Sequence, residues 1–499
     1  MSPIPANSSL KRPETDTKLY WLVLALVTVI LITPIWLTTF NPLVDYPGHL
    51  ARAWAIYAYP HDVFLQTHFI RSLDPMPNLA IDVLVPLLLP FLAPLTAGKA
   101  FLSLIILLFI YGCHELAYYA HHRFTWTVPL AAFFVLNSPF LYGFVNSSFS
   151  LSLFLVTFAL WLRFQTAWTP LRVLTLAALA TITYLSHLSG FAFLALGIAG
   201  YISSRVLLRR TLDSWALVGF LPLTPAVVLQ LYPWSNKVHL GASLGWSSLT
   251  KKAIILGSAF LSYRYWVSLV VVAAWGVGAL ILLRYANFKL HPLLGWVGAA
   301  FLAAGIVCPS QLTAGGGDGA DARFIPPAMV FLLLAFIPGL SGKAGRLAFL
   351  LVLGAMLVRT ADIASVWYDQ STRCSRMVSV LDHVNPRSRI YALFGFPTDY
   401  QDAKMARSNL YMSTYALIFR DSISSILYAV KGVQPLYFRD TSESELNQDP
   451  TTFDPAYLDV RLRKFDYVFG CNLDSRYTTY LSTRTQPLAS GEGCALWHL

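Results

Sequence analysis

Charged residues are scarce in this chain. Asp, Glu, Lys and Arg together make up 12% of its 499 residues, whereas 56% are hydrophobic. A soluble globular protein carries about 25% charged residues, so the composition excludes a soluble globule and predicts a protein that crosses the membrane several times. The net charge of +11 does not indicate nucleic acid as a partner, because the basic residues are dispersed among short loops, as the positive-inside rule expects.

Cysteine and the common site motifs are also sparse. Five cysteines are too few for a disulfide scaffold, and the sequence contains no CxxC, HExxH or GxGxxG motif. Cys471 and Cys494 lie in the polar C-terminal part. A bridge between these two residues is expected only if this part lies outside the cytoplasm.

Long apolar segments are what the chain has in abundance. Their centres fall near residues 30, 88, 109, 136, 156, 178, 195, 222, 275, 300, 332 and 352, which makes about twelve candidate helices of the roughly 20 residues that a crossing needs. The first runs from about Leu19 to Phe40. It is too long for the apolar core of a signal peptide, so we expect it to be retained as a transmembrane helix.

The charges of the loops limit the number of crossings. With a cytoplasmic N-terminus, the basic loops at Arg205, Arg284 and Lys343 should also be cytoplasmic. This requires an even number of crossings before Arg205. Seven candidate helices, an odd number, precede Arg205. In one interpretation residues 79–96, interrupted by three prolines, do not span the membrane. In the other, residues 171–202 form one broken helix. Both predict about eleven transmembrane helices.

The C-terminal part differs in kind from the rest. Short runs rich in β-branched and aromatic residues, at 389–394, 426–430 and 466–470, are bounded by Pro, Gly and Asp and predict strands. We therefore expect a polytopic transmembrane domain at residues 1–365 and a small α/β domain at residues 366–499.

The same loop charges predict which segments share a side of the membrane. With a cytoplasmic N-terminus, residues 41–78, residues 315–324 and the C-terminal domain all become extracytoplasmic. The expected location is the inner (plasma) membrane of a bacterium, with the C-terminal domain in the periplasm.

The segment Asn41–Trp54 places three polar residues just beyond the first apolar segment. Asp45, His49 and Arg52 are spaced i, i+4, i+7 and share one face of a helix. The opposite face carries apolar and aromatic residues, namely Leu50, Trp54, Tyr57 and Ala58. This pattern predicts an amphipathic helix on the membrane surface, with Asp45 as its N-cap. The alternative is an ordinary capped surface helix.

A second polar segment leads into a late apolar helix. Residues 315–319 are rich in glycine and continue to Arg323 and a pair of prolines that suit a first helical turn. Arg323 would stand at the edge of the bilayer, where a lipid phosphate lies; the alternative is an arginine that reaches ordinary headgroups. Asp318 and Asp321 could bind a divalent metal together with Asp45, or simply be solvated.

Weaker candidates lie inside or beside apolar segments. His187 is costly in lipid unless it faces a cavity or is hydrogen-bonded in the packing. Asn146 either lines a cavity or belongs to a turn. Asp62 and Asp74 share the first loop with Asp45 and are the alternative acids.

This layout resembles the GT-C superfamily of integral membrane glycosyltransferases, in particular the protein O-mannosyltransferases and aminoarabinose transferases. The resemblance rests on the acid at position 45 in the first external loop, on Arg323-Phe-x-x-Pro at the start of a late helix, and on the terminal α/β domain. It implies that Asp45 is the essential acid, that the donor is a polyprenyl-phosphate sugar, and that Arg323 suits the lipid-linked phosphate. The sequence departs from the usual adjacent acidic pair, because Tyr46 follows Asp45.

The predicted function is therefore an inverting transfer of a sugar from a polyprenyl-phosphate donor to a lipid, glycan or protein acceptor outside the cytoplasm. A carboxylate can take the proton of the attacking hydroxyl group, which is the role expected of Asp45. Positive charge and polar groups should hold the departing phosphate and the substrate. The residues expected to do so are His49, Arg52, Arg323, His187 and Asn146.

Two other functions remain open from the sequence. A transporter or flippase of lipid-linked intermediates would need ionisable residues near the bilayer midplane, for which His187 and Asp82 are the only candidates seen. A non-catalytic membrane scaffold would use the C-terminal domain to bind partners.

Overall fold

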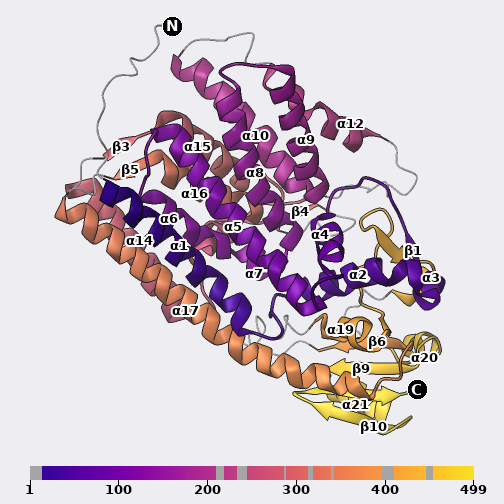
Figure 1. The fold of residues 1–499 in the computed structure, drawn as a ribbon. Coiled ribbons are helices and arrows are strands. Elements are labelled where there is room, and N and C mark those ends of the chain that lie inside the picture. The colour runs from indigo at the N-terminus through magenta and orange to yellow at the C-terminus, as the bar shows by residue number, and fades with distance from the viewer. Residues whose placement is uncertain are drawn as a thin grey trace.

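A computed structural model describes residues 14–209, 218–232, 244–285, 288–312, 319–338, 342–395, 410–444 and 453–499. Most of these residues form a large helical body, and the C-terminal residues form a sheet at one end of it (Figure 1).

Six helices in the described part of the chain are long and apolar enough to cross a membrane. They are α1 (Glu14–Leu37), α5 (Pro94–His121), α8 (Val145–Phe164), α10 (Leu188–Arg209), α14 (Tyr265–Tyr285) and α17 (Lys343–Ser379). Shorter helices lie between them, namely α2 (Tyr46–Ala58), α3 (Val63–His68), α4 (Ala80–Leu88), α6 (Thr127–Ala131), α7 (Ser138–Leu141), α9 (Pro170–Ser186), α12 (Thr224–Leu231), α13 (Leu249–Gly257), α15 (Pro292–Val307) and α16 (Ile325–Ala335). The chain is thus a polytopic helical membrane protein, as the composition predicted. The number of eleven crossings stays a prediction.

Short 3₁₀-helices and strands join these elements. The 3₁₀-helices are η1 (Tyr59–His61), η2 (Ala132–Leu136), η3 (Leu221–Leu223), η4 (Ser258–Phe260), η5 (Ala322–Phe324), η6 (Val380–His383), η7 (Met412–Thr414) and η8 (Thr441–Glu443). Two antiparallel pairs of short strands link loops of the helical body, β2 (Leu244–Gly245) with β4 (Gln311–Leu312) and β3 (Phe288–Leu290) with β5 (Phe336–Pro338).

The structure bears on both interpretations of the apolar segments. Within residues 79–96, α4 has nine residues and, at 1.5 Å per residue, is far shorter than the roughly 30 Å of a bilayer core. Helices α9 and α10 are separate, because the extended backbone of His187 (φ −172°) interrupts them and the two helices pack against each other. Both observations favour the interpretation in which residues 79–96 do not span.

Helix α17 connects the helical body to the C-terminal sheet. It has 37 residues, lies beside α1, and runs along one side of the molecule as far as the sheet (Figure 1). The predicted boundary between residues 365 and 366 falls inside this helix. A continuous helix, rather than a linker, therefore joins the two parts of the chain.

The C-terminal sheet has five strands in the order β10-β11-β9-β6-β7. They are β6 (Arg389–Phe394), β7 (Ile423–Ser424), β9 (Tyr467–Cys471), β10 (Pro487–Gly491) and β11 (Cys494–His498), and the helices α19 (Tyr415–Arg420), α20 (Pro455–Leu462) and α21 (Ser475–Ser482) accompany them. Strand β6 is parallel to β7 and β9, whereas β11 is antiparallel to β9 and β10. The strands predicted at 389–394 and 466–470 are confirmed, the second within one residue.

The strand predicted at 426–430 was wrong. This run is irregular, and the short strand β7 precedes it. The apolar residues in it, such as Leu427 and Ala429, are buried against the first loop, so their hydrophobic character reflects packing between segments rather than a place in the sheet.

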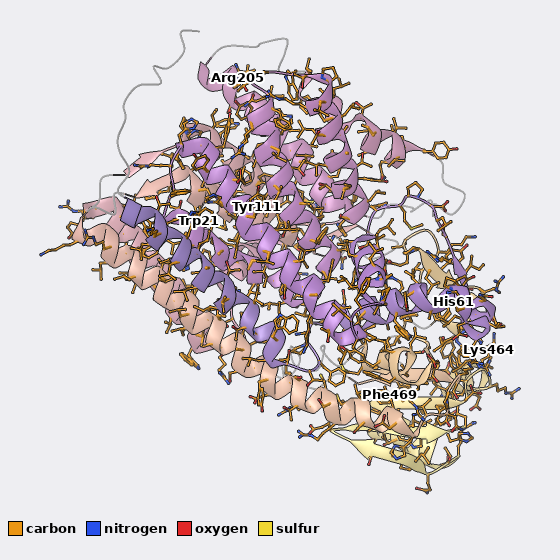
Figure 2. All side chains as sticks on the ribbon, viewed as in Figure 1. Trp21, His61, Tyr111, Arg205, Lys464 and Phe469 are labelled. Carbon is orange, nitrogen blue, oxygen red and sulfur yellow. A yellow bond between two sulfur atoms is a disulfide. The ribbon has the colours of Figure 1, made fainter. Side chains whose placement is uncertain are left out.

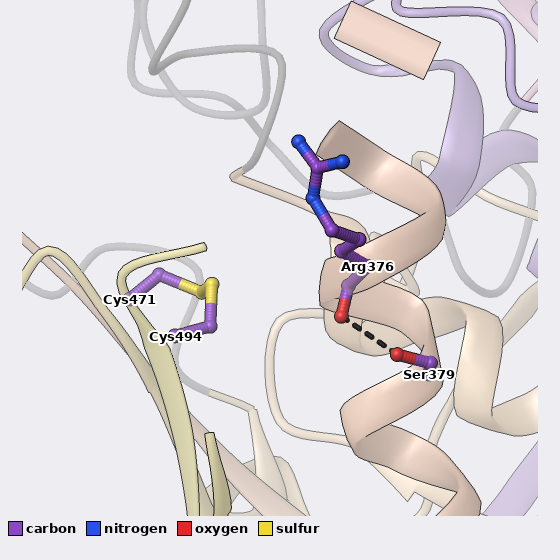
Figure 3. The surroundings of a disulfide bond; sticks show 4 residues. All are labelled: Arg376, Ser379, Cys471 and Cys494. Carbon is purple, nitrogen blue, oxygen red and sulfur yellow. Dashed lines mark hydrogen bonds between the residues drawn. A yellow bond between two sulfur atoms is a disulfide. The ribbon is translucent and has the colours of Figure 1, made fainter. Parts of the chain in front are cut away.

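A disulfide joins Cys471 to Cys494 across neighbouring strands (Figure 3). It faces the end of α17, where Arg376 forms an ion pair with Glu492 of the adjoining hairpin. A disulfide here agrees with an oxidising compartment for the C-terminal part.

The first loop packs directly onto the C-terminal part. Strand β1 (Phe69–Arg71) pairs antiparallel with β8 (Leu436–Phe438). Both segments contribute to one buried apolar cluster, which contains Ala51, Ala55, Ile56, Leu65, Phe69, Leu417, Ile423, Leu427, Ala429, Leu436 and Phe438. Figure 2 shows Arg205 at the end of the helical body opposite to His61 of the first loop and Lys464 of the C-terminal part. The first loop and the C-terminal part therefore share one end of the molecule.

Protein covers much of the helix after Asp45. Most residues of α2 are buried against α4, α5, η7 and α19, whereas Tyr57 near its end is exposed. Its place at the membrane surface stays a prediction. Leu50, on the face expected to meet lipid, is fully buried. A period of 3.6 residues shows that a helix has two faces, but it does not say whether lipid or protein covers them.

Candidate active site

The backbone of Asp45 is held by the turn before α8. The Asp45 N–H group donates to the Tyr142 carbonyl oxygen at 3.1 Å. Next to it, Gly143 has a φ of +86°, and a Cβ atom there would lie 2.7 Å from the Asp45 nitrogen. Only glycine allows both this backbone conformation and this close approach, so Gly143 fixes where α2 begins.

The carboxylate of Asp45 is not used as a cap. Asp45 occupies the N-cap position of α2 without a side-chain hydrogen bond to the helix, and within the described part of the chain no residue donates a hydrogen bond to its oxygens. Burial raises the pKa of Asp45 to about 7, and the positive charge of Arg323 acts in the opposite direction. A carboxyl group that exchanges its proton near neutral pH is suited to general base catalysis.

Arg323 is carried by η5, directly before α16. Its guanidinium lies over the Phe144 ring, 4.8 Å from the ring centre. The preceding Asp321 is completely buried, and its oxygens accept hydrogen bonds from Lys252 Nζ and the Ser310 hydroxyl group, each at 2.7 Å. Lys252, on α13, also donates to the carbonyl groups at the end of α15. This buried ion pair therefore positions the short helix that presents Arg323.

The structure gives Asp321 a different role from the one predicted. One of its carboxylate oxygens is bonded to Lys252 and Ser310, and the other accepts from the Ala322 N–H group. Asp318 lies outside the described residues. The described ranges contain no group of three His, Cys, Asp or Glu side chains placed to hold a metal ion together, and a metal site that includes Asp318 stays a prediction.

Arg52 is fully buried in the middle of α2. It forms two hydrogen bonds of 2.9 Å to the carboxylate of Asp82 on α4, one of 2.8 Å to the Tyr428 carbonyl oxygen, and one of 2.9 Å to His49 Nδ1. Protein groups thus occupy four of its five N–H donors. Its place in the structure is that of an internal tie between α2, α4 and the C-terminal part, rather than that of a substrate contact.

His49 and His187 lie on separate elements but close together. His49 is on α2, and His187 joins α9 to α10. Their charges interact with each other, and the charge of Arg323 acts on His187. The structure thus brings together three of the predicted site residues around Asp45.

Asn146 forms hydrogen bonds that join two helices near the site. Its amide nitrogen donates to the backbone carbonyl and the side-chain oxygen of Asn78, and its oxygen accepts from the Ile81 N–H group, all at 2.8 Å. These hydrogen bonds hold the start of α4 against α8. The alternative acid Asp62 caps α3, whereas the charge of Arg323 acts on Asp45. A role for the other alternative acid, Asp74, stays a prediction.

Several residues of the site escaped sequence reasoning. Tyr411 comes from the C-terminal part, and burial together with the Asp45 charge raises the pKa of its hydroxyl group. Phe144 and Lys252 position Arg323, as described above. None of these residues lies near Asp45 in the sequence. We refer to Asp45, His49, His187, Arg323 and Tyr411 as the Asp45 cluster.

The fold is similar to that of ArnT, a GT-C aminoarabinose transferase. The crystal structure of ArnT from Cupriavidus metallidurans bound to undecaprenyl phosphate matches with a TM-score of 0.51 and 12% identity, over 96% of this chain and 98% of that one. Its apo state matches with a TM-score of 0.51 and 11% identity, over 97% and 98%. No protein-family model and no curated protein matches the sequence. The GT-C-like fold predicted from the layout is confirmed, and at this identity the similarity concerns the fold alone.

Proposed function

We propose that this protein is a glycosyltransferase that moves a sugar from a polyprenyl-phosphate donor to a hydroxyl group of an acceptor. The observation that carries the proposal is the juxtaposition of the Asp45 carboxyl group with Arg323. Glycosyl transfer from a lipid phosphate needs a base at the acceptor and positive charge at the leaving group. This pair supplies both charges at one place.

The reaction assigns one bond change to each charge. The acceptor oxygen forms a bond to C1 of the sugar, while the bond between C1 and the phosphate oxygen breaks. Asp45 takes the proton of the acceptor hydroxyl group, and the electron pair of the broken bond remains on the polyprenyl phosphate, whose charge Arg323 stabilises. A single displacement of this kind inverts the configuration at C1.

The lipid part of the donor and the side of the membrane rest on separate support. One ArnT structure of the same fold holds undecaprenyl phosphate, which favours a polyprenyl phosphate here. The Asp45 cluster shares its end of the molecule with a disulfide-bonded sheet, and Arg205 lies at the other end. This arrangement favours a site outside the cytoplasm, in the plasma membrane of a bacterium, with a cytoplasmic N-terminus.

The structure favours the transporter alternative less than the glycosyltransferase. Asp82 forms a buried ion pair with Arg52, and Arg52 also donates to the Tyr428 carbonyl oxygen. This pair ties α2, α4 and the C-terminal part together, so a structural role accounts for Asp82.

The test is Asp45→Asn in purified protein reconstituted in nanodiscs, with release of undecaprenyl phosphate measured over a panel of undecaprenyl-phosphate sugars. Loss of the base should lower the transfer rate by about 10²- to 10⁴-fold. The melting temperature at pH 8 should stay the same or rise, because asparagine removes a charge that burial disfavours.

The matched control is Asp62→Asn in the same loop. Asparagine caps a helix as well as aspartate does, so transfer should continue at the rate of the unaltered protein. Full activity of Asp45→Asn would rule out Asp45 as the base, and loss of activity only in Asp62→Asn would move that role to Asp62.

A further inference from the structure

The two histidines of the Asp45 cluster share an unusual constraint. His49 Nδ1 lies 2.9 Å from Nη2 of Arg52. A guanidinium group offers only donors, so this ring nitrogen must be the acceptor. A neutral imidazole that accepts at Nδ1 carries its proton on Nε2. Arg52 thereby selects the tautomer of His49.

His187 is held in the same state by a different donor. The backbone N–H group of Ser189 donates to His187 Nδ1 at 3.0 Å, and a backbone amide nitrogen cannot accept in return. The Ser189 hydroxyl group lies 2.8 Å from the same nitrogen and 2.9 Å from the Ser147 hydroxyl group. His187 therefore also carries its proton on Nε2.

Both Nε2–H groups lack an acceptor in the described part of the chain. The hydrogen bonds of the described residues reach only the Nδ1 atom of each ring. His49 keeps only 8% of its surface exposed. Burial, together with the charge of Arg52, holds the pKa of His49 well below 6.5, which keeps the ring neutral at physiological pH.

These donors come from three elements that meet beside Asp45. His49 is on α2, His187 is at the junction of α9 and α10, and Arg323 is on η5. The start of α8 brings them together. Phe144 lies under the Arg323 guanidinium, and Ser147 bonds to the Ser189 hydroxyl group beside His187. The preceding Gly143 is in contact with the backbone of Asp45, whose carbonyl oxygen accepts from the His49 N–H group. A set of N–H donors of this kind is matched by a ligand with several acceptor oxygens, such as a phosphate group.

We infer that His49 and His187 donate hydrogen bonds from Nε2 to the oxygens of the donor lipid's phosphate, beside the charge of Arg323. This inference rests on the proposed function and deepens it. Arg52 and the Ser189 amide are positioning residues, because they act by fixing the tautomers. Neutral donors add weaker hydrogen bonds than further cations would, which favours release of the polyprenyl phosphate after transfer.

The test compares asparagine with glutamine at each histidine. Glutamine places an amide N–H group near the position of Nε2, whereas asparagine reaches only the position of Nδ1. Binding of undecaprenyl phosphate is measured by native mass spectrometry in phosphatidylcholine nanodiscs, and undecaprenol is the control ligand without phosphate. His49→Asn and His187→Asn should each weaken phosphate binding about tenfold, the glutamine variants should stay within about threefold of the unaltered protein, and undecaprenol binding should not change.

The outcomes separate this inference from the proposed function. If all four histidine variants bind undecaprenyl phosphate normally while Arg323→Ala weakens binding, the inference is overturned and the proposed function stands. If glutamine impairs binding as much as asparagine, the Nε2 donor has no role. If the unaltered protein prefers undecaprenyl phosphate no more than undecaprenol, the proposed function itself fails.

Two further arms cover folding and the source of the phosphate. His187 lies on a different element from His49, so either pair of variants decides the question if the other lowers the melting temperature. Phosphatidylglycerol is then added to the nanodiscs. Displacement of undecaprenyl phosphate by an equal amount of phosphatidylglycerol would show a site for ordinary headgroups and would also overturn the inference.

Discussion

Two arginine–carboxylate pairs lie along α2, and they differ in how their charges are satisfied. In the middle of the helix, Arg52 and Asp82 form two direct hydrogen bonds and are sealed from solvent. At its start, Asp45 interacts with the charge of Arg323, but its carboxylate accepts no hydrogen bond from the described residues and keeps partial exposure. The same residue types therefore hold the structure together in one place and are available for chemistry in the other.

The two roles differ in whether protein groups already occupy the hydrogen-bonding atoms of the charged side chain, and not in residue type. A buried charge that is fully paired cannot take a proton or a ligand without breaking its bonds, whereas a carboxyl group that accepts no hydrogen bond from the protein can. Each of the following changes is designed to break or to sharpen this contrast.

The largest effect is expected from breaking the pair of Arg52 and Asp82. Asp82→Ala leaves the Arg52 charge buried without its partner, which should lower the free energy of unfolding by about 3–5 kcal/mol. Thermal unfolding in detergent measures this loss. The double variant Arg52→Met with Asp82→Ala removes both charges and should recover much of the stability; an Asp82→Ala protein as stable as the unaltered one would show that the pair is not a structural tie.

A smaller effect is expected from breaking the ion pair of Lys252 and Asp321, which positions Arg323 beside Asp45. Lys252→Met leaves Asp321 buried with a charge that only the Ser310 hydroxyl group and the Ala322 N–H group offset. Stability should fall by about 2–4 kcal/mol, and transfer should slow about tenfold as η5 and Arg323 shift. Both are measured on the same preparation, by thermal unfolding and by release of undecaprenyl phosphate.

The double variant Lys252→Met with Asp321→Asn is the matched control for this prediction. It removes the unpaired charge and should restore most of the stability. If Lys252→Met loses stability while its transfer rate and KM stay unchanged, Lys252 stabilises the fold without positioning Arg323.

The smallest effect is expected in the pH profile of transfer. Asp45 must be ionised to act as a base, so kcat/KM should rise as the pH increases through about 7, the pKa of its carboxyl group. Arg323 lowers this pKa. Arg323→Gln should therefore move the acidic limb to higher pH, whereas Arg323→Lys, which keeps the charge, should leave it in place. If the acidic limbs of the two variants fall at the same pH, Arg323 does not act on the base.

The layout of the membrane part followed from the sequence to a large extent. The lengths of the apolar runs and the charges of the loops predicted a polytopic helical protein and gathered residues 41–78 and the C-terminal part at one end of the molecule. The structure pairs β1 with β8 at that end. These features depend on hydrophobicity and charge summed over many residues, so single misjudged positions do not change them.

The roles of single residues could not be predicted in the same way. Asp45, His49 and Arg52 share a helix face, yet only contacts from α4, η5 and the junction of α9 and α10 distinguish them. Arg52 was expected to bind substrate, and the expectation could not foresee Asp82 and the Tyr428 carbonyl group as its partners. Tyr411 and Lys252 lie hundreds of residues from Asp45 and form no motif with it.

The sequence by itself determined that this protein crosses the membrane many times and that an acid stands at position 45 beyond the first helix, because composition and order along the chain are sufficient for both. Only the tertiary structure decided which charged side chains pair with one another. Hydrogen bonds and burial depend on neighbours that the chain brings together by folding, and these neighbours closed the pair of Arg52 and Asp82 and left Asp45 beside Arg323 with a pKa near 7.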